Sequence, residues 1–293
     1  MRKEDEILQQ LQDWATNQEQ IRAMVMTSSR ANPRAHTDLF SDYDIELFVQ
    51  DLQPFAESDQ WLEAFGEILV RWPRKPTSFD EGGITRLVIF DDGLRIDFQL
   101  DTTHALAEFM APTLDIGYDN GYKILLDKDN RLQNATAPTH TGYVLRKPTQ
   151  KEFDELLDEF WWDITYVAKS LWRDELVFAK YMLDSLIRFS YFEKMVEWTI
   201  GVRTDWTANP NKHGRWFKRY LDSQTWTDLE ATFAGAGIED NWTALFNMID
   251  LFRRLTKEVG NSLNYPYPSD LDRRVTAYLT KIRNLAADAE DFL

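Results

Sequence analysis

The spacing of apolar residues divides the chain into a first half of short runs and a second half of long periodic stretches. The short runs predict strands, because side chains on successive strand residues point to opposite faces. Asp91-Asp92-Gly93 is a turn signal that joins two of them into a hairpin. Apolar spacings of three and four predict helices over 4–20 and 58–70. The predicted strands are 23–27, 45–49, 85–90, 94–100 and 122–126.

The second half carries almost only helical patterns. Apolar residues recur at spacings of three and four from about Thr149 onward, which is typical of helices with one buried face. Pro148 marks a boundary, because the residue before a proline disfavours helix. We therefore predict an α+β protein with an α/β domain over 1–147 and a helical domain over 148–293. The predicted helices of the second domain are 150–172, 175–199, 240–258 and 269–287.

Charge and cysteine content narrow the classes of function. The 293 residues contain 49 acidic and 33 basic side chains, for a formal net charge of −16, and no cysteine. The absence of cysteine excludes disulfides, thiolate metal sites and cysteine nucleophiles. Strong acidity argues against nonspecific binding to a phosphate backbone. No apolar run has the length of a membrane span. Taken together, these features lead us to expect a cytoplasmic protein that binds neither nucleic acid nor membrane.

Three aspartates are the candidate chemical groups. Asp42 and Asp44 are two residues apart where a predicted strand begins, so an extended backbone points both side chains to one face. Asp97 alternates with apolar residues on a hairpin strand and projects away from them. Carboxylates that converge in this way favour a cation, and Mg²⁺ takes oxygen ligands and bridges to phosphates. The upstream turn at Ser28-Ser29 offers N–H groups and a hydroxyl to a phosphate.

Each of these signals is weak by itself. A D-x-D pair is common in an acidic chain, and Asp97 alone could be a surface carboxylate of the hairpin. The ordered set is more specific, because a strand, a serine turn, D-x-D and a distal Asp follow one another. This order resembles the nucleotidyltransferase superfamily with the DNA polymerase β-like fold. Ser28 stands where that pattern normally has a glycine.

Four segments narrow the resemblance to a family. The chain resembles the aminoglycoside 6-adenylyltransferases, also called streptomycin adenylyltransferases, in the segments TSSRAN, FSDYDIELFV, RIDFQL and NKHGRWFKRYL. The resemblance implies a nucleotidyltransferase domain with a small mixed sheet flanked by helices, followed by an all-α bundle that completes the drug pocket. It also implies Mg²⁺-dependent transfer of an adenylyl group from ATP to an aminoglycoside hydroxyl, with the 6-hydroxyl of streptomycin as the first expectation. Pyrophosphate would leave, and the product would confer antibiotic resistance.

The resemblance also assigns roles to individual residues. Asp42 and Asp44 would be metal ligands, and Asp97 would be a third ligand or the general base, with the choice left open. Phosphate contacts are expected from a serine turn in the first domain and from basic side chains in the second. Lys212 is the preferred basic residue. Lys180 and Arg188 are weaker candidates, because they could equally be snorkelling side chains on an apolar helix. The expected phosphate contacts are Ser28, Ser29, Arg30, Lys180, Arg188 and Lys212.

An acidic and aromatic cluster on the helix over 150–172 is the candidate acceptor site. Glu155, Glu159 and Asp163 are four residues apart and share a helix face. With Trp162 and Trp172 they would suit ammonium or guanidinium groups, through charge-assisted hydrogen bonds and cation–π contacts. The alternative is an acidic solvent face with aromatic residues in the core.

Two other functions remain open at this point. A nucleotidyltransferase of the same fold could modify another small molecule, a protein or an RNA, although acidity disfavours RNA. A degenerate relative could bind a nucleotide without catalysis, but the three carboxylates argue against it. In either case we expect a monomer or a weak homo-oligomer.

Overall fold

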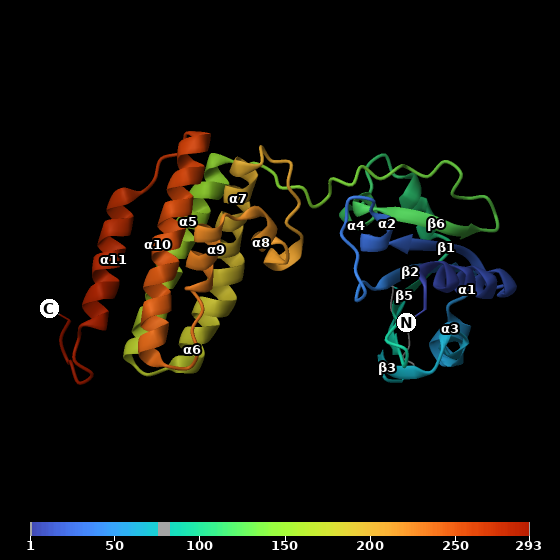
Figure 1. Ribbon diagram of the computed structural model, residues 1–293, viewed down its shortest axis with the longest axis horizontal. Helices are drawn as coiled ribbons and strands as arrows, with labels where there is room; N and C mark the ends of the chain where they lie inside the picture. The colour runs from blue at the N-terminus through green and yellow to red at the C-terminus, as the bar shows by residue number, and fades with distance from the viewer. Residues whose placement is uncertain (1, 76–82, 293) are drawn as a thin grey trace. The chain divides into compact units, whose positions relative to one another are not determined.

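The protein is described by a computed structural model over residues 2–75 and 83–292, and it divides into two compact units. The first unit is Met1–Tyr143 and the second is Val144–Leu293 (Figure 1). The first combines a β-sheet with helices, and the second is helical, so the predicted α+β fold class is confirmed. In the described part of the chain, no helix is both long and apolar enough to cross a membrane.

The first unit is built on one six-stranded mixed sheet in the order β3-β4-β5-β2-β1-β6. The two central strands, β2 (Tyr43–Val49) and β5 (Arg95–Thr102), run parallel, and the other neighbouring pairs are antiparallel. Each of the five predicted strands is present. The remaining strands are β1 (Ile21–Thr27), β3 (Ile68–Trp72), β4 (Ile84–Phe90) and β6 (Tyr122–Asp127).

The edge strand β3 differs from the prediction, since apolar spacing predicts a helix over 58–70. The structure has a short 3₁₀ helix, η1 (Gln60–Phe65), followed by β3. Gly66 separates them with φ of +141°, a backbone conformation that ends a helical turn and that glycine adopts readily. The chain beyond it pairs with β4, a distant partner that local periodicity does not reveal.

The sheet has one thickly covered face and one thinly covered face. Helix α1 (Glu4–Asn17) buries Ile7, Leu11 and Ala15 against alternate strand residues such as Ile45 and Phe98. The opposite face has a smaller core around Phe48 and Phe109, which includes residues of β1 and of the 3₁₀ helix η2 (Ala105–Met110). Polar side chains of β2 and β5 lie on this second face, because they alternate with the residues buried under α1.

The second unit is a helical bundle with its own core. Its first helix, α5 (Gln150–Trp172), begins with a capping box in which Thr149 and Glu152 bond to each other's backbone N–H groups. Helices α5 and α10 lie side by side in Figure 1, and the rings of Phe160 and Phe252 stack with their centroids 3.5 Å apart. The other elements are α6 (Leu176–Lys180), η3 (Tyr181–Phe192), α7 (Glu193–Arg203), η4 (Lys212–Gly214), α8 (Phe217–Tyr220), α9 (Ser223–Glu230), α10 (Ile238–Leu263) and α11 (Ser269–Arg283).

The predicted helix over 175–199 is present but is not a uniform α-helix. The chain stays helical from Leu176 to Arg203, with π-helical hydrogen bonding in η3 between α6 and α7. A π-helix widens the backbone spiral and shifts the face that side chains share. Apolar spacing predicts a helix here but not its hydrogen-bond pattern.

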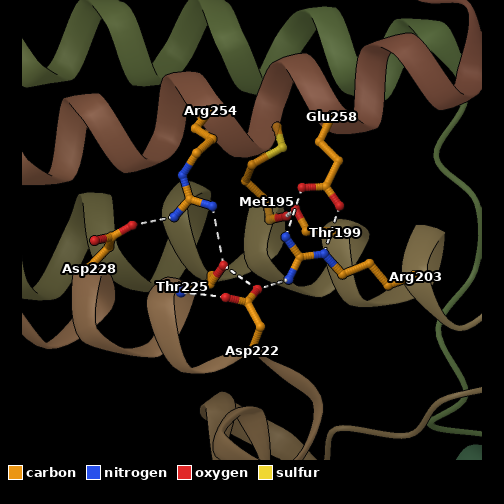
Figure 2. Close-up of polar contacts among 8 residues, drawn as sticks. All are labelled: Met195, Thr199, Arg203, Asp222, Thr225, Asp228, Arg254 and Glu258. Carbon is orange, nitrogen blue, oxygen red and sulfur yellow. Dashed lines mark hydrogen bonds and ion pairs between the residues drawn. The ribbon is translucent and has the colours of Figure 1, made fainter.

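An ion-pair network joins α7 and α10 to the start of α9 (Figure 2). Arg203, at the end of α7, donates to both carboxylate oxygens of Glu258 on α10, at 2.6 and 2.8 Å. The same guanidinium donates to Asp222 at 2.7 Å, and Asp222 caps α9 by accepting from the Thr225 N–H at 2.9 Å. A single side chain therefore connects three helices that are distant in sequence.

Arg203→Met should lower the free energy of unfolding by about 1–3 kcal/mol, because hydrogen bonds to charged groups contribute on that order. Chemical denaturation of the full chain measures the change. Arg273→Met is the matched control: its pair with Asp270 is 71% and 67% exposed, so its loss should cost less than about 1 kcal/mol. Equal effects of the two substitutions would contradict a connecting role for Arg203.

Candidate active site

The sheet brings the D-x-D segment and the distal aspartate together on its thinly covered face. Asp44 pairs with Thr27 at the end of β1 on one side and with Asp97 of β5 on the other. The parallel pairing is in register, so Asp44 and Asp97 are direct neighbours that point the same way. Asp42 lies just before β2, two residues from Asp44. The structure thus places Asp44 and Asp97 side by side on neighbouring strands, with Asp42 in the segment that leads into β2.

Ser28 connects the turn after β1 to these carboxylates. Its φ is +61°, in the left-handed region where glycine is favoured and where a residue with a Cβ carries a strain of about 1–2 kcal/mol. This is the position at which the related pattern has glycine. The Ser28 side chain compensates with a bond that glycine cannot make, because its hydroxyl donates to the Asp44 carboxylate. The chain therefore passes from β1 into the one-turn helix α2 (Ser28–Ala31) through a left-handed serine, where the related pattern has glycine.

Arg95 is the residue of this site that the sequence analysis missed. Its Nε and Nη2 atoms donate to the two carboxylate oxygens of Asp97, at 2.9 and 2.8 Å. Its Nη1 atom lies 3.3 Å from Oδ2 of Asp42. The signal was present in the sequence, because residues two apart on a strand share a face. What the sequence could not show is that this guanidinium would lie between two of the aspartates.

The carboxylates retain an excess of negative charge despite Arg95. Burial, together with the charges of Asp97 and Asp42, raises the pKa of Asp44 to about 6, against the opposing bond from Ser28 and the charge of Arg95. Burial likewise raises the pKa of Glu46, two residues along β2, to about 7. Glu46 accepts a 2.8 Å hydrogen bond from the Tyr118 hydroxyl, which lowers its pKa in part. A cation would relieve this repulsion.

The donor set fits a hard divalent cation in its chemistry. Asp42, Asp44 and Asp97 offer carboxylate oxygens, which Mg²⁺ prefers, and the repulsion at Asp44 is of the sign that a cation removes. Over residues 2–75 and 83–292, no three Asp, Glu or His side chains lie close enough together to hold a metal ion. In the structure the side chains of Asp42 and Asp97 are bound to Arg95.

Asp44→Asn should stabilise the metal-free protein at pH 8. The pKa of Asp44 is higher in the folded state than its ordinary value of 3.8, so ionisation destabilises the fold as pH rises from about 4 to about 6. Asparagine removes this cost, worth about 1–3 kcal/mol, and still accepts from Ser28. The gain should be about half as large at pH 5. Thermal unfolding in EDTA measures it, with Glu67→Gln as an exposed control; a large loss of stability at pH 8 would contradict the repulsion.

Arg30, predicted to contact phosphate, instead anchors the loop that carries Asp42. Its Nη2 and Nε atoms donate to the backbone carbonyls of Ser41 and Asp42, at 2.8 and 3.2 Å. Its Nη1 donates to Glu4 at 2.8 Å, and the guanidinium lies 4.0 Å from the ring centroid of Tyr43. These contacts fix the start of β2, so Arg30 positions Asp42.

Two of the three predicted phosphate contacts in the second unit form one internal cluster. Arg188 is 5% exposed and donates to the hydroxyl and carbonyl of Thr232 and to Asp184, at 2.8–2.9 Å. Lys180 also pairs with Asp184 and donates to the Ala234 carbonyl at 2.8 Å. These bonds favour a structural role for both cations. Lys212, in contrast, lies on the surface at the start of η4.

The acidic face of α5 is present, and one of its members has an aromatic partner. Asp163 accepts a 2.8 Å hydrogen bond from the Tyr191 hydroxyl, and Glu159 is close enough to raise the pKa of the same tyrosine. Glu155 pairs with Lys151 at 3.6 Å on the solvent side. Trp162 is 68% exposed. Glu159 and Asp163 are therefore the two acids of this face that lie near the Tyr191 hydroxyl.

Trp172 lies too far from these acids to belong to the same pocket. The rise of an α-helix puts it about 20 Å beyond Glu159 along α5. Its indole N–H donates to the Ala286 carbonyl at 3.3 Å, and it lines a cavity of about 230 Å³ with Tyr278 and Phe292. Sequence proximity on a long helix is not proximity in space, and the contacts of Trp172 lie with α11 and the segment that follows it.

Comparison with known proteins identifies the chain's relatives. The family model for streptomycin adenylyltransferase matches residues 1–282. The chain belongs to this family. It is 34% identical to the aminoglycoside 6-adenylyltransferase of Bacillus subtilis, over 95% of this chain and 97% of that protein. The aminoglycoside 6-adenylyltransferase of Campylobacter jejuni is 32% identical, over 96% of each chain.

A solved structure belongs to the same group. The crystal structure of an aminoglycoside 6-adenyltransferase from Bacillus subtilis matches 97% of this chain and 100% of its own, at 31% identity and a TM-score of 0.48. Membership in the streptomycin adenylyltransferase family makes the protein an enzyme of the nucleotidyltransferase class.

Proposed function

We propose that the enzyme transfers an adenylyl group from ATP to a hydroxyl of a cationic aminoglycoside, with the 6-hydroxyl of streptomycin as the first candidate. The observation that carries the proposal is the in-register pairing of Asp44 with Asp97 beside the Ser28 turn. The names of the relatives supply the acceptor class. The modified drug would carry a bulky anionic group, so we expect the reaction to confer antibiotic resistance. Because the reaction consumes ATP, we expect it to take place in the cytoplasm.

The carboxylate face would bind the nucleotide with Mg²⁺. Asp42, Asp44 and Asp97 would hold the ion, which when bound supplies positive charge to the triphosphate and the leaving pyrophosphate. Arg30 keeps the Asp42 loop in place through the two backbone carbonyls that it binds. The turn at Ser28 and Ser29 would present N–H groups to phosphate oxygens. Lys212 remains the proposed phosphate contact from the second unit.

Transfer requires a new bond, a broken bond and a proton acceptor. The acceptor hydroxyl attacks the α-phosphorus, the new O–P bond forms, and the bond to the β-phosphate oxygen breaks to release pyrophosphate. Asp97 would take the proton from the attacking hydroxyl if it is not mainly a ligand of the ion, and the Mg²⁺ dependence of Asp97→Asn distinguishes these two roles. Most of the remaining rate would come from holding the two substrates in line.

The acidic face of α5 would hold the drug. Glu159 and Asp163 offer carboxylates beside the Tyr191 ring, a combination that suits guanidinium groups. Glu155 and Trp162 would extend the same surface. Such contacts are partly exposed, so salt should weaken drug binding.

Glu159→Gln should raise the KM for streptomycin about tenfold. A hydrogen bond to a charged group contributes about 1.5–3 kcal/mol, and partial exposure of this surface brings the loss to the lower end of that range. The KM for ATP should not change. Asp270→Asn is the control, because Asp270 lies exposed on α11, pairs with Arg273 and is not part of the proposed drug surface. An unchanged KM for streptomycin in Glu159→Gln would move the drug site away from this face.

A panel of acceptors tests the proposed function directly. Purified enzyme with ATP and Mg²⁺ is offered streptomycin, aminoglycosides that lack its guanidinium groups, a protein mixture and RNA, and mass spectrometry detects an added adenylyl group. We expect streptomycin to be modified and RNA and protein to remain unmodified. Modification of protein or RNA alone would overturn the aminoglycoside assignment and leave the same-fold alternative.

A further inference from the structure

Arg95 occupies the carboxylate oxygens that a divalent cation would need. Its guanidinium binds both oxygens of Asp97 in a bidentate pair and also contacts Asp42. A cation bound to the same carboxylates would compete for those lone pairs and would repel the guanidinium at close range. The observed pair therefore opposes the binding of a cation to the same carboxylates.

The Arg95 side chain is free to move away from the aspartates. It is 41% exposed, so it can turn toward solvent without disturbing the core. The buried residues of β5 point to the opposite face of the sheet and would not be affected. Released in this way, the guanidinium presents planar N–H donors that match phosphate oxygens as well as carboxylates. The triphosphate of a nucleotide at this site is the anion that would receive it.

We propose that Arg95 is an internal counter-ion that couples cation binding to nucleotide binding. Without nucleotide, Arg95 holds Asp42 and Asp97 and keeps the affinity for a free divalent cation low. With nucleotide, the guanidinium transfers to the triphosphate, and the carboxylates become available to the cation. This inference rests on the proposed function, because it takes the carboxylates as cation ligands. It adds a role for Arg95 in the order of binding: the enzyme takes up the cation together with the nucleotide.

Two binding measurements on Arg95→Met test the coupling. Methionine keeps an unbranched side chain and removes the charge. Water-proton relaxation with Mn²⁺ and no nucleotide should show the variant binding Mn²⁺ about tenfold more tightly than the wild type, a coupling of ordinary size. Calorimetry with α,β-methylene-ATP at saturating Mn²⁺ should show the variant binding the nucleotide about tenfold more weakly. The opposite directions separate this role from a structural one, because local damage would weaken both.

The controls separate failure of this inference from failure of the proposed function. Arg22→Met removes a guanidinium that pairs with Asp129 near the other end of β1, and it should change neither affinity. Asp44→Asn should abolish Mn²⁺ binding with or without Arg95. If Mn²⁺ binding depends on Asp44 but is not tighter in Arg95→Met, the counter-ion role is overturned and the cation site stands. If Mn²⁺ binding does not depend on Asp44 in any variant, the cation site and the role of Arg95 both fail.

Discussion

Asp44→Asn should reduce kcat by at least about a thousandfold while the fold remains intact. Asp44 is the central carboxylate of the site, between Ser28 and Asp97, and its burial and the charges of Asp97 and Asp42 raise its pKa. Asparagine keeps the shape and the bond from Ser28 but removes the charge that would hold Mg²⁺ against the triphosphate. A thousandfold loss corresponds to about 4 kcal/mol of barrier, a typical share for a cation in phosphoryl transfer.

Steady-state kinetics with saturating ATP, Mg²⁺ and streptomycin measures the effect. Asp91→Asn is the matched control, because Asp91 lies exposed in the turn of the β4–β5 hairpin and its loss should leave kcat unchanged. Thermal unfolding at pH 8, where we expect Asp44→Asn to be more stable than the wild type, shows independently that this variant is folded. A variant that keeps more than about a tenth of the wild-type kcat, a difference of about 1.4 kcal/mol, would remove Asp44 from the metal site.

Asp97→Asn should lower kcat by about 10²–10⁴, the usual range for loss of a general base. The KM for ATP should change little, because Asp42 and Asp44 remain. Unchanged activity would exclude Asp97 from the reaction.

The dependence on Mg²⁺ separates the two roles proposed for Asp97. If the residue acts as the base, the Mg²⁺ concentration for half-maximal rate should match that of the wild type. If it acts mainly as a ligand, that concentration should rise. Arg95 loses its bidentate partner in this variant, so Arg95→Met/Asp97→Asn is the control that separates the effect of the freed guanidinium.

The local parts of the fold could be predicted from the sequence, and the non-local parts could not. Apolar alternation located β1, β2, β4, β5 and β6, because one face of each strand contributes to a buried core. The same rule failed for β3, where a distant strand supplies the hydrogen bonds. It also predicted one helix across η3, because apolar spacing does not separate π from α hydrogen bonding over so short a stretch.

The carboxylate site shows the same division. Spacing along the chain identified Asp42, Asp44 and Asp97, but their proximity depends on the register of two parallel strands joined by a long connection. The direction in which the Arg95 side chain points also depends on a residue distant in sequence, Asp42. Arg95 turns to Asp97 and Asp42, whereas Arg30 turns to the loop before β2, and nothing in their immediate sequence distinguishes them.

The basic residues of the second unit were harder to interpret. Arg188 and Lys180 look available on an apolar helical pattern, yet Thr232 and Ala234, far along the chain, fold back and accept their hydrogen bonds. A tertiary partner of this kind leaves no trace in helical periodicity. The separation of Trp172 from Glu159, by contrast, follows from the rise of the helix alone and was predictable.

The fate of isotopic label from ATP tests adenylyl transfer at the carboxylate site most directly. The enzyme is incubated with streptomycin, Mg²⁺ and ATP labelled either in the α-phosphate or in the γ-phosphate, and the drug is separated and counted. We predict that the α-label moves to the drug and the γ-label leaves in pyrophosphate, and that Asp44→Asn stops both. Recovery of the γ-label on the drug, or transfer of the α-label that persists in Asp44→Asn, would contradict the account.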